Sequence, residues 1–454
     1  MPRPRLECFV MPTELLRPAR SLNGSLTLPG DKSISHRYAM LAGLAEGVTR
    51  LSNFSTGADP HSTLSCMATL GAPVAAQSGG MVTITGTAGH LQQPQRSLDC
   101  GNSGSTMRML AGLIASHPHT FLLTGDESLS ARPMERIRKP LAQMGAEIHL
   151  TGGDGALGGH APMTVVGHPL TAIDFSTPIP SAQVKTAVLF AGLQAQGTTS
   201  LSEAILTRDH TEHALRAFGA TLTRSESTKD GTAKISIEGG QQLRAIEATV
   251  PGDLSSAAFF LAASLLFPDS HLVLDAIGMN PTRSALLDVI SGLGAKIRVL
   301  NVEEHHGELV GTLQINADPN SRKLTGPLEI SGTLAAQLID EIPVLAAIAP
   351  YTRNGIRVRD AKELRIKESD RIDLVARNLR AMGADLTEFE DGLDIPGGQQ
   401  LHGAEIDSGH DHRIAMAFSI AALRATSDTA IHGAEAAAIS FPEFFSHLDR
   451  LAVR

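Results

Sequence analysis

Two short segments combine small residues with cations just before an apolar stretch. Residues 28–37 read Leu-Pro-Gly-Asp-Lys-Ser-Ile-Ser-His-Arg, and residues 101–108 read Gly-Asn-Ser-Gly-Ser-Thr-Met-Arg. A loop of small residues that enters a helix offers free amides and the positive end of the helix dipole to an anion. Lys32 and Arg37 would add full charges, although Asp31 before the lysine rules out a nucleotide P-loop. Each segment predicts an anion site, and a simple capped helix start explains either one about as well.

A third segment of this kind opens with a hydroxyl group. Residues 181–185, Ser-Ala-Gln-Val-Lys, precede another apolar stretch. Hydroxyl, amide and ammonium groups at a helix start suit a phosphorylated polyol, because each can hydrogen-bond to phosphate or hydroxyl oxygens. Ordinary capping of the helix by Ser181 explains the segment equally well.

Two segments that carry carboxylates supply candidate acid–base groups. Residues 340–343, Asp-Glu-Ile-Pro, are expected to end an apolar helix, where unpaired carboxylates would be costly to bury. In residues 367–371, the groups Lys367, Glu368 and Arg371 fall within one turn of an expected amphipathic helix. A carboxylate among cations stays ionised and can act as a base. A surface ion pair is the simpler alternative for the second segment.

Metal and thiol chemistry have little support in the sequence. His410 and His412 flank Asp411, but no remote cluster supplies matching ligands, so we expect no metal. The three cysteines are Cys8, Cys66 and Cys100. They lack metal-ligand spacing, and neither Cys66 nor Cys100 has a Lys or Arg in the same short motif. We therefore expect thiols without a catalytic or metal-binding role, in a protein of the reducing cytoplasm.

Charge and hydropathy exclude several classes of protein. The formal net charge of -9 argues against general nucleic-acid binding, which needs a basic surface. The longest apolar stretch, residues 257–267, is well short of the ~20 residues of a membrane span. The N-terminus carries arginines but no continuous apolar segment, so we expect no secretory signal. Cations concentrate in residues 132–139 and 353–371, which fits a focused anion pocket as well as solvated helix faces.

A recurring segment that ends in Gly-Ala indicates internal repeats. Its glycines stand at positions 71, 145, 219, 294 and 383, at intervals of 74, 74, 75 and 89 residues. Before the last of them, Ile372, Val375, Leu379 and Met382 form one apolar helix stripe, and Gly383 can end that helix in a left-handed conformation. Short β-rich segments open most units, at residues 47–51, 197–201 and 355–358.

A second type of helix recurs and is apolar nearly all round. Residues 181–193, 254–266 and 412–423 are rich in Ala, Leu and Phe, and helices without a polar face are buried. Each unit thus holds a buried helix, an amphipathic helix and several strands, the last unit lacking its Gly-Ala. About six units of ~75 residues account for the length and predict α/β layers.

Taken in order, seven segments resemble the enolpyruvyl transferase family, and within it the 3-phosphoshikimate 1-carboxyvinyltransferases (EPSP synthases). The segments are residues 30–37, 101–104, 131–134, 207–210, 340–343, 367–371 and 411–413, and the resemblance covers residues 25–445. Each segment is moderately specific, and their co-occurrence in this order is highly specific.

The resemblance implies the fold class in more detail. It implies an α/β protein of two domains, an inside-out α/β barrel of six repeats with helices buried and sheets outward. The first domain would be discontinuous, residues 1–31 and 251–454, and the second would be residues 32–250. The chain would cross between the domains near Lys32 and near residues 250–253. Substrates would bind in the cleft between the domains, which closes on them.

The resemblance also implies a reaction without metal or organic cofactor. The enolpyruvyl group of phosphoenolpyruvate moves to the 5-hydroxyl of 3-phosphoshikimate through a tetrahedral intermediate, and phosphate leaves. The residues carried over for 3-phosphoshikimate are Lys32, Ser33, Arg37, Ser181, Ala182, Gln183, Arg208, Asp340 and Lys367. Those carried over for phosphoenolpyruvate are Lys32, Asn102, Gly104, Arg132, Gln183, Arg371 and Arg413. Catalysis would rest on Lys32, on Asp340 taking the hydroxyl proton and on Glu368 exchanging protons at the methylene carbon.

Departures and alternatives qualify this resemblance. Residues 436–438 are alanines where some members carry a phosphate-contacting lysine, and Ser105 stands where Thr is usual. The related UDP-N-acetylglucosamine enolpyruvyl transferases use a cysteine where this chain has residues 130–133, Ser-Ala-Arg-Pro, which weighs against that activity. A non-catalytic anion-binding repeat protein is the other alternative. We expect a monomer without nucleic-acid or membrane partners, inhibited competitively by glyphosate because Gly104 leaves space beside the phosphoenolpyruvate carboxylate.

Overall fold

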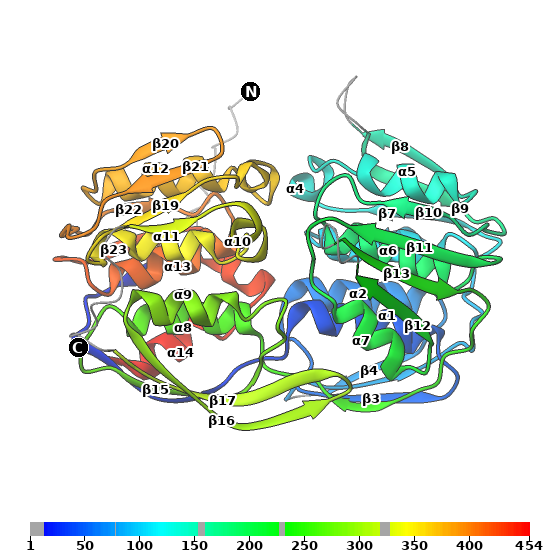
Figure 1. Ribbon diagram of the computed structural model, residues 1–454, viewed down its shortest axis with the longest axis horizontal. Coiled ribbons are helices and arrows are strands. Elements are labelled where there is room, and N and C mark those ends of the chain that lie inside the picture. Colours follow the sequence, from blue (N-terminus) through cyan, green and yellow to red (C-terminus); the bar gives the residue numbers. More distant parts are fainter. Residues whose placement is uncertain (1–12, 78, 153–158, 227–231, 318–326) are drawn as a thin grey trace, which may run out of the picture.

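Six small sheets and the helices that connect them make up the computed structural model, which describes residues 13–77, 79–152, 159–226, 232–317 and 327–454. Cys8 and the other N-terminal residues lie outside the described residues. The elements gather into two halves that lie side by side (Figure 1).

One half carries three sheets of four strands each. In the order of their hydrogen bonding they are β14 (Glu247–Thr249), β3 (Val48–Ser52), β5 (Met81–Thr85) and β4 (Val74–Gln77); β6 (Leu98–Asp99), β7 (Thr120–Thr124), β9 (His160–Val166) and β8 (Glu147–Gly152); and β10 (Asp174–Ser176), β11 (Thr198–Glu203), β13 (Ala233–Glu238) and β12 (Leu222–Glu226). In each sheet the first pair is parallel and the other two pairs are antiparallel.

The other half repeats this pattern with variations at the chain ends. Its sheets are β16 (Ala295–His305), β17 (Glu308–Ala317), β15 (His271–Gly278), β2 (Ser21–Thr27) and β24 (Ala452–Val453); β18 (Leu328–Ile330), β19 (Ile356–Val358), β21 (Gly392–Ile395) and β20 (Thr387–Phe389); and β1 (Thr13–Leu16), β23 (Thr429–His432) and β22 (Glu405–Asp407). The strands expected at the start of three units are therefore confirmed as β3, β11 and β19.

Five amphipathic helices of the described chain end at the repeated glycines. They are α2 (Ala58–Thr69), α5 (Glu135–Gln143), α7 (His210–Ala217), α9 (Ala285–Leu293) and α12 (Arg371–Ala381). The glycines Gly71, Gly145, Gly219, Gly294 and Gly383 have φ between 88° and 120°. L side chains rarely adopt this conformation, so glycine is the residue that can turn each helix into the next strand.

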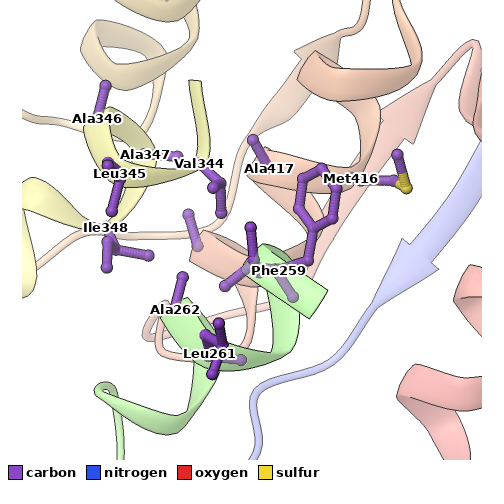
Figure 2. Packing of buried hydrophobic residues seen from close by; sticks show 14 of the residues in the cluster. Phe259, Leu261, Ala262, Val344, Leu345, Ala346, Ala347, Ile348, Met416 and Ala417 are labelled. Carbon is purple, nitrogen blue, oxygen red and sulfur yellow. The ribbon is translucent and has the colours of Figure 1, made fainter. Parts of the chain in front are cut away.

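The apolar helices form the centres of two separate hydrophobic cores. The first core draws on residues 16–28 and 254–451 and includes α8 (Leu254–Ser264), α11 (Ile342–Ile348) and α13 (His412–Ala422). The second draws on residues 34–250 and includes α1 (Lys32–Leu44), α3 (Gly104–Ile114) and α6 (Ala182–Gly192). Figure 2 shows Phe259 of α8, Val344 of α11 and Ala417 of α13 in the shared interior of the first core. The predicted burial of the apolar helices is confirmed, since every residue of α8 and α13 is buried.

The chain passes between the two cores in two adjacent segments. The Asp31 amide donates to Pro251 O (2.7 Å), and the Asp253 amide donates to Pro29 O (3.0 Å). Gly30 bridges Gly252 between them. A Cβ on Gly30 would lie 1.9 Å from the backbone oxygen of Asn53, so the close approach of the first crossing to the backbone at residue 53 requires glycine. The paired crossings place the start of α1 and the start of α8 next to each other.

Three helix boundaries differ from the sequence predictions. α1 begins at Lys32, inside the segment of residues 28–37 that was expected to precede the helix, because the Asp31 side chain caps it by accepting from the Ile34 amide. α12 begins at Arg371, capped by Asp370, so Lys367 and Glu368 precede the helix instead of lying in its first turn as expected. Asp340 precedes α11 rather than ending a helix, because α10 (Gly332–Gln337) stops before it. No helix among the described residues is long and apolar enough to cross a membrane.

Candidate active site

A cavity of about 560 Å³ lies between the two cores, and most of the predicted site residues line it. Those that line it are Lys32, Ser33, Arg37, Gly104, Arg132, Ser181, Ala182, Gln183, Arg208, Asp340, Lys367, Glu368, Arg371 and Arg413. Asn102 stands behind this lining, where its carbonyl and side-chain oxygens accept from the Arg132 guanidinium (3.2 and 2.7 Å). Segments far apart in the sequence thus meet around one space.

Three buried helices of the second core point their N-termini at the cavity. Asp31 caps α1, Ser103 caps α3 by accepting from the Thr106 amide, and Ser181 caps α6 by accepting from the Val184 amide. The residues Lys32, Gly104 and Ser181 at these starts line the cavity. Both explanations of the segments therefore hold together: the side chains cap the helices, and the dipoles and remaining amides face a site suited to anions.

Two cations of this wall, Arg37 and Lys32, are anchored by polar neighbours. Arg37 is 3% exposed and donates to the hydroxyl groups of Thr211 (2.7 Å) and Thr186 (2.8 Å). Burial lowers its pKa to about 10, which leaves it charged at neutral pH. Lys32 pairs with Asp59 at 3.1 Å. Burial raises the pKa of Asp59, and the Lys32 ammonium only partly offsets this.

Asp340 sits among cations from both halves of the molecule. Its Oδ2 lies 2.5 Å from Arg208 Nη2 and 3.8 Å from Arg413 Nη2, and its Oδ1 lies 3.7 Å from Arg371 Nη1. Burial alone would raise the pKa of Asp340, but Arg413, Arg208, Lys367 and Arg371 hold it well below the usual value. Asp340 is therefore an ionised carboxylate inside the cleft.

Glu368 is a second carboxylate of the cleft and shares Arg371 with Asp340. It pairs with Arg371 (2.5 Å, Oε2 to Nη2) on its own side and with Arg132 (3.4 Å, Oε1 to Nη1) across the cleft. Burial would raise its pKa, but Arg371 and Arg132 hold the pKa of Glu368 well below the usual value. Burial also lowers the pKa of Lys367. The two candidate acid–base groups are thus both ionised and both cross-linked to the opposite wall.

Several lining residues escaped the sequence predictions. The principal ones are Asp59, Arg108, Arg136, Asp253, Ser255, Arg283, Glu363 and His412. Arg108 is the last residue of the segment 101–108 that predicted an anion site, so the sequence did mark it as a candidate. Its Nη1 donates to Gln183 Oε1 (2.8 Å). Arg136 crosses the cleft to Glu363 at 2.8 Å. Arg283 forms ion pairs with Asp31 (3.4 Å) and Glu341 (3.3 Å), which are distant in the sequence. No sequence motif marks Arg283 as a site residue.

Of the histidines and cysteines considered for metal or thiol chemistry, all but Cys8 lie among the described residues. Both ring nitrogens of His412 lack a hydrogen-bond partner among the described residues, and burial lowers the pKa of His412 well below its usual value, so it is neutral. No group of three or more His, Cys, Asp or Glu in the described ranges could hold a metal ion. A hydrogen bond with Cys66 and burial raise the pKa of the Cys100 thiol well above the usual value. That thiol is unreactive at neutral pH.

A second cavity, of about 620 Å³, lies beside β3, β14, β15 and β17. Its charged lining mixes Arg50 with the acidic Glu247, Asp275 and Glu303. It contains none of the three helix starts and none of the predicted site residues. The cavity between the cores is therefore the better candidate for phosphorylated ligands, because cations outnumber acids on its walls.

Comparison with known proteins identifies the family. The EPSP synthase (3-phosphoshikimate 1-carboxyvinyltransferase) family model matches residues 16–448. A 3-phosphoshikimate 1-carboxyvinyltransferase of Koribacter versatilis is 57% identical over 439 residues, which are 97% of this chain and 99% of the relative. One of Solibacter usitatus is 50% identical over 96% of this chain and 99% of the relative.

Solved structures agree with this relationship. EPSP synthase from Acinetobacter baumannii superposes with a TM-score of 0.82 at 39% identity, over 97% of this chain and 98% of that one. The enolpyruvyl transferase NikO of Streptomyces tendae, at 20% identity and a TM-score of 0.73, shares the fold. The resemblance drawn from the seven motifs is confirmed: the chain belongs to the EPSP synthase (3-phosphoshikimate 1-carboxyvinyltransferase) family.

Proposed function

We propose that this chain transfers the enolpyruvyl group of phosphoenolpyruvate to the 5-hydroxyl of 3-phosphoshikimate and releases phosphate, as a step of the shikimate pathway. The observation that carries the proposal is a cleft in which arginines and lysines from both halves converge on two ionised carboxylates. Two polyanions can meet only where pre-placed cations and helix ends neutralise their charge. Family membership points to the same reaction.

We assign each substrate a set of residues in the cleft, and the two sets share Lys32 and Gln183. 3-Phosphoshikimate would be held by Lys32, Ser33, Arg37, Ser181, Ala182, Gln183, Arg208, Asp340 and Lys367. Phosphoenolpyruvate would be held by Lys32, Gly104, Arg132, Gln183, Arg371 and Arg413, with Asn102 orienting Arg132 from behind. Arginine suits this role, because its planar fork binds carboxylate and phosphate groups in bidentate fashion.

The reaction needs one proton acceptor at oxygen and one exchanger at carbon. In the addition step the 5-hydroxyl oxygen bonds to C2 of phosphoenolpyruvate, Asp340 takes the hydroxyl proton, and a proton from Glu368 goes to the methylene carbon. In the elimination step that carbon returns a proton to Glu368, the double bond reforms and the bond between C2 and the phosphate oxygen breaks. The leaving phosphate takes up the proton that Asp340 accepted, so both carboxylates end as they began. Glu368 is ionised beside its arginines, and two bound polyanions would raise its pKa toward the protonated state that the addition requires.

The organisation of the molecule follows the same assignment. Residues 1–31 and 251–454 would form one domain and residues 32–250 the other, a division supported by the two separate cores and the paired crossings. The six sheets would correspond to six repeats of an inside-out α/β barrel. We also propose that the protein acts as a cytoplasmic monomer without an organic cofactor and that glyphosate competes with phosphoenolpyruvate.

A phosphate-release assay with each acceptor tests the reaction. We expect turnover with 3-phosphoshikimate and phosphoenolpyruvate and none with UDP-N-acetylglucosamine. Turnover with the nucleotide sugar alone would reject the proposal.

Conservative replacement of the two carboxylates tests their roles. Asp340→Asn and Glu368→Gln are expected to lower kcat by roughly 10²-fold or more, the usual contribution of a positioned acid or base. Thermal unfolding checks that each variant is folded. A non-catalytic anion-binding protein would show no turnover to lose, and folded variants with unchanged rates would contradict the assigned roles.

A further inference from the structure

A polar cluster outside the cleft also joins the two halves. The hairpin of β16 and β17 extends from the first core beneath the second (Figure 1). Glu308, at the start of β17, is 2% exposed, and its Oε1 lies 2.7 Å from His210 Nδ1 of α7. Asn280, also 2% exposed, donates through Nδ2 to Glu308 Oε2 (2.9 Å) and to Asp209 Oδ1 (2.8 Å). Two residues of one core therefore hold two consecutive residues of the other.

The hydrogen bonds of this cluster fit a single protonation pattern. Burial alone would raise the pKa of Glu308, but His210, Asn280 and His213 hold it below the usual value, so the side chain is a carboxylate. A carboxylate can only accept, which makes both His210 and Asn280 donors to it. Because these groups are buried, each hydrogen bond to the charged acceptor has little competition from water.

The hairpin turn packs directly against the helix that the cluster holds. A Cβ on Gly307 would lie 2.3 Å from His213 Nδ1, and Gly307 has a φ of +83°. His306 Nε2 reaches Glu247 O at 3.3 Å. The tip of the hairpin is thus fitted to the second core along its surface as well as through the buried cluster.

The anchored residues follow immediately on a residue of the cleft. Arg208 lines the cavity and pairs with Asp340, and Asp209 is its neighbour in the chain. On the other side of Arg208, Lys185 Nζ donates to Thr207 O (3.3 Å). The backbone on either side of Arg208 is therefore fixed, once from its own core and once from the opposite one.

We propose that Glu308 and Asn280 are positioning residues for Arg208: by holding Asp209 and His210 across the boundary between the cores, they set the direction in which the Arg208 guanidinium meets 3-phosphoshikimate. The inference rests on the assignment of Arg208 to 3-phosphoshikimate in the proposed function. Its consequence is that loss of the cluster weakens the binding of 3-phosphoshikimate and leaves the binding of phosphoenolpyruvate unchanged.

Steady-state kinetics of Glu308→Gln test this role. The substitution removes the negative charge with almost no change of shape, so the bonds from His210 and Asn280 are no longer charge-assisted. We expect KM for 3-phosphoshikimate to rise roughly tenfold or more, while KM for phosphoenolpyruvate and kcat change little. Glu304→Gln, an exposed position on the same hairpin, serves as the matched control and should leave all three constants unchanged. If Glu308→Gln does not fold, Asn280→Ser takes its place.

A double-mutant cycle separates this inference from the proposed function. Arg208→Ala alone should raise KM for 3-phosphoshikimate, and adding Glu308→Gln to it should raise KM no further, because the positioned group is gone. An unchanged KM in Arg208→Ala would overturn the assignment of Arg208, and with it the inference. If Arg208→Ala raises KM but Glu308→Gln has no effect, or has its full effect in the double mutant, the positioning role alone is overturned.

Discussion

Asp340 and Glu368 are already paired with the arginines that the proposed substrates need. In the structure, Arg208 contacts Asp340 and Arg371 contacts Glu368. A phosphate or carboxylate group that binds the same arginines takes over part of that pairing. The carboxylates then lose stabilisation of their charged forms, so their pKa values rise. The proposed roles therefore couple substrate binding to the basicity of Asp340 and Glu368 through the arginines that they share with the substrates.

Gly104 leaves its helix start open beside two guanidinium groups. A Cβ there would lie 3.0 Å from Arg108 Nη1 and 3.4 Å from Arg132 Nη1. In Gly104→Ala, we expect the inhibition constant of glyphosate to rise roughly tenfold through overpacking, with a smaller rise in KM for the shorter phosphoenolpyruvate. Inhibition kinetics measure both. Gly292→Ala, where a Cβ meets nothing within 4 Å, is the control; an unchanged inhibition constant in Gly104→Ala would contradict the steric account.

Asp253 carries a buried charge at the second chain crossing. Burial, and next the nearby Asp31 carboxylate, raise the pKa of Asp253 to about 6. A raised carboxyl pKa means that the folded state binds a proton more readily than the unfolded state, so this group's contribution to stability grows as pH falls through 6 toward 4. The free energy of unfolding of Asp253→Asn, taken relative to that of the wild type, should therefore be about 2 kcal/mol higher at pH 7 than at pH 4.5.

Chemical denaturation at the two pH values measures this difference. Asp269→Asn, at an exposed position, controls for the general effect of losing a carboxylate. A difference between wild type and Asp253→Asn that does not depend on pH would show that Asp253 does not titrate in this range.

At the scale of elements, the sequence predicted the amphipathic helix, its terminating glycine and the strand after it in each repeat. An apolar stripe that ends at Gly383 predicts a helix, its end and the following strand, because each follows from side-chain spacing or from a positive φ. Helix starts were predicted less well. Asp31 and Asp370 are the N-caps of their helices. In the sequence predictions, Asp31 is part of an anion-binding loop and Asp370 is part of the helix. The position of Asp340 before α11 had no such local marker.

The buried helix α6 depends on a charge cluster inside the second core. Lys185 Nζ lies 2.9 Å from Glu203 and 3.0 Å from Glu212, and all three side chains are at most 2% exposed. Lys185→Met would leave two buried carboxylates without their cation, so we expect a loss of roughly 3–5 kcal/mol in the free energy of unfolding, measured by denaturant titration. Lys234→Met breaks an exposed pair with Asp174 and should cost less than about 1 kcal/mol. Equal losses in the two variants would contradict this account.

At the scale of the molecule, the site exists only because the two cores face each other. Arg132–Glu368, Arg136–Glu363 and Arg208–Asp340 each join one wall of the cleft to the other. Composition and spacing predicted the separate anion segments and the repeat, but not which segments would meet. That convergence came from the family resemblance, whereas Arg283 and Glu308, which lie outside its motifs, required the fold.

Charge distribution predicts a dependence on ionic strength. The chain has a net charge of -9, yet its cleft concentrates cations. Salt screens this local attraction, so KM for both anionic substrates should rise when KCl increases from about 0.02 M to about 0.5 M, where the Debye length falls below about 5 Å. Thermal unfolding over the same range is the control for salt effects on the fold. KM values independent of salt would show that short-range contacts alone capture the substrates.

The paired crossings also dictate an order of assembly. β2 lies between β15 and β24, and β1 pairs with β23, so the strands near the start of the chain have no partners until residues 271–278, 429–432 and 452–453 have been made. The second core, by contrast, uses only residues 34–250. During synthesis, all residues of the second core leave the ribosome before residues 254–451 of the first core. β2 can pair with β15 once residues 271–278 are made, whereas β1 has no partner until residues 429–432 follow.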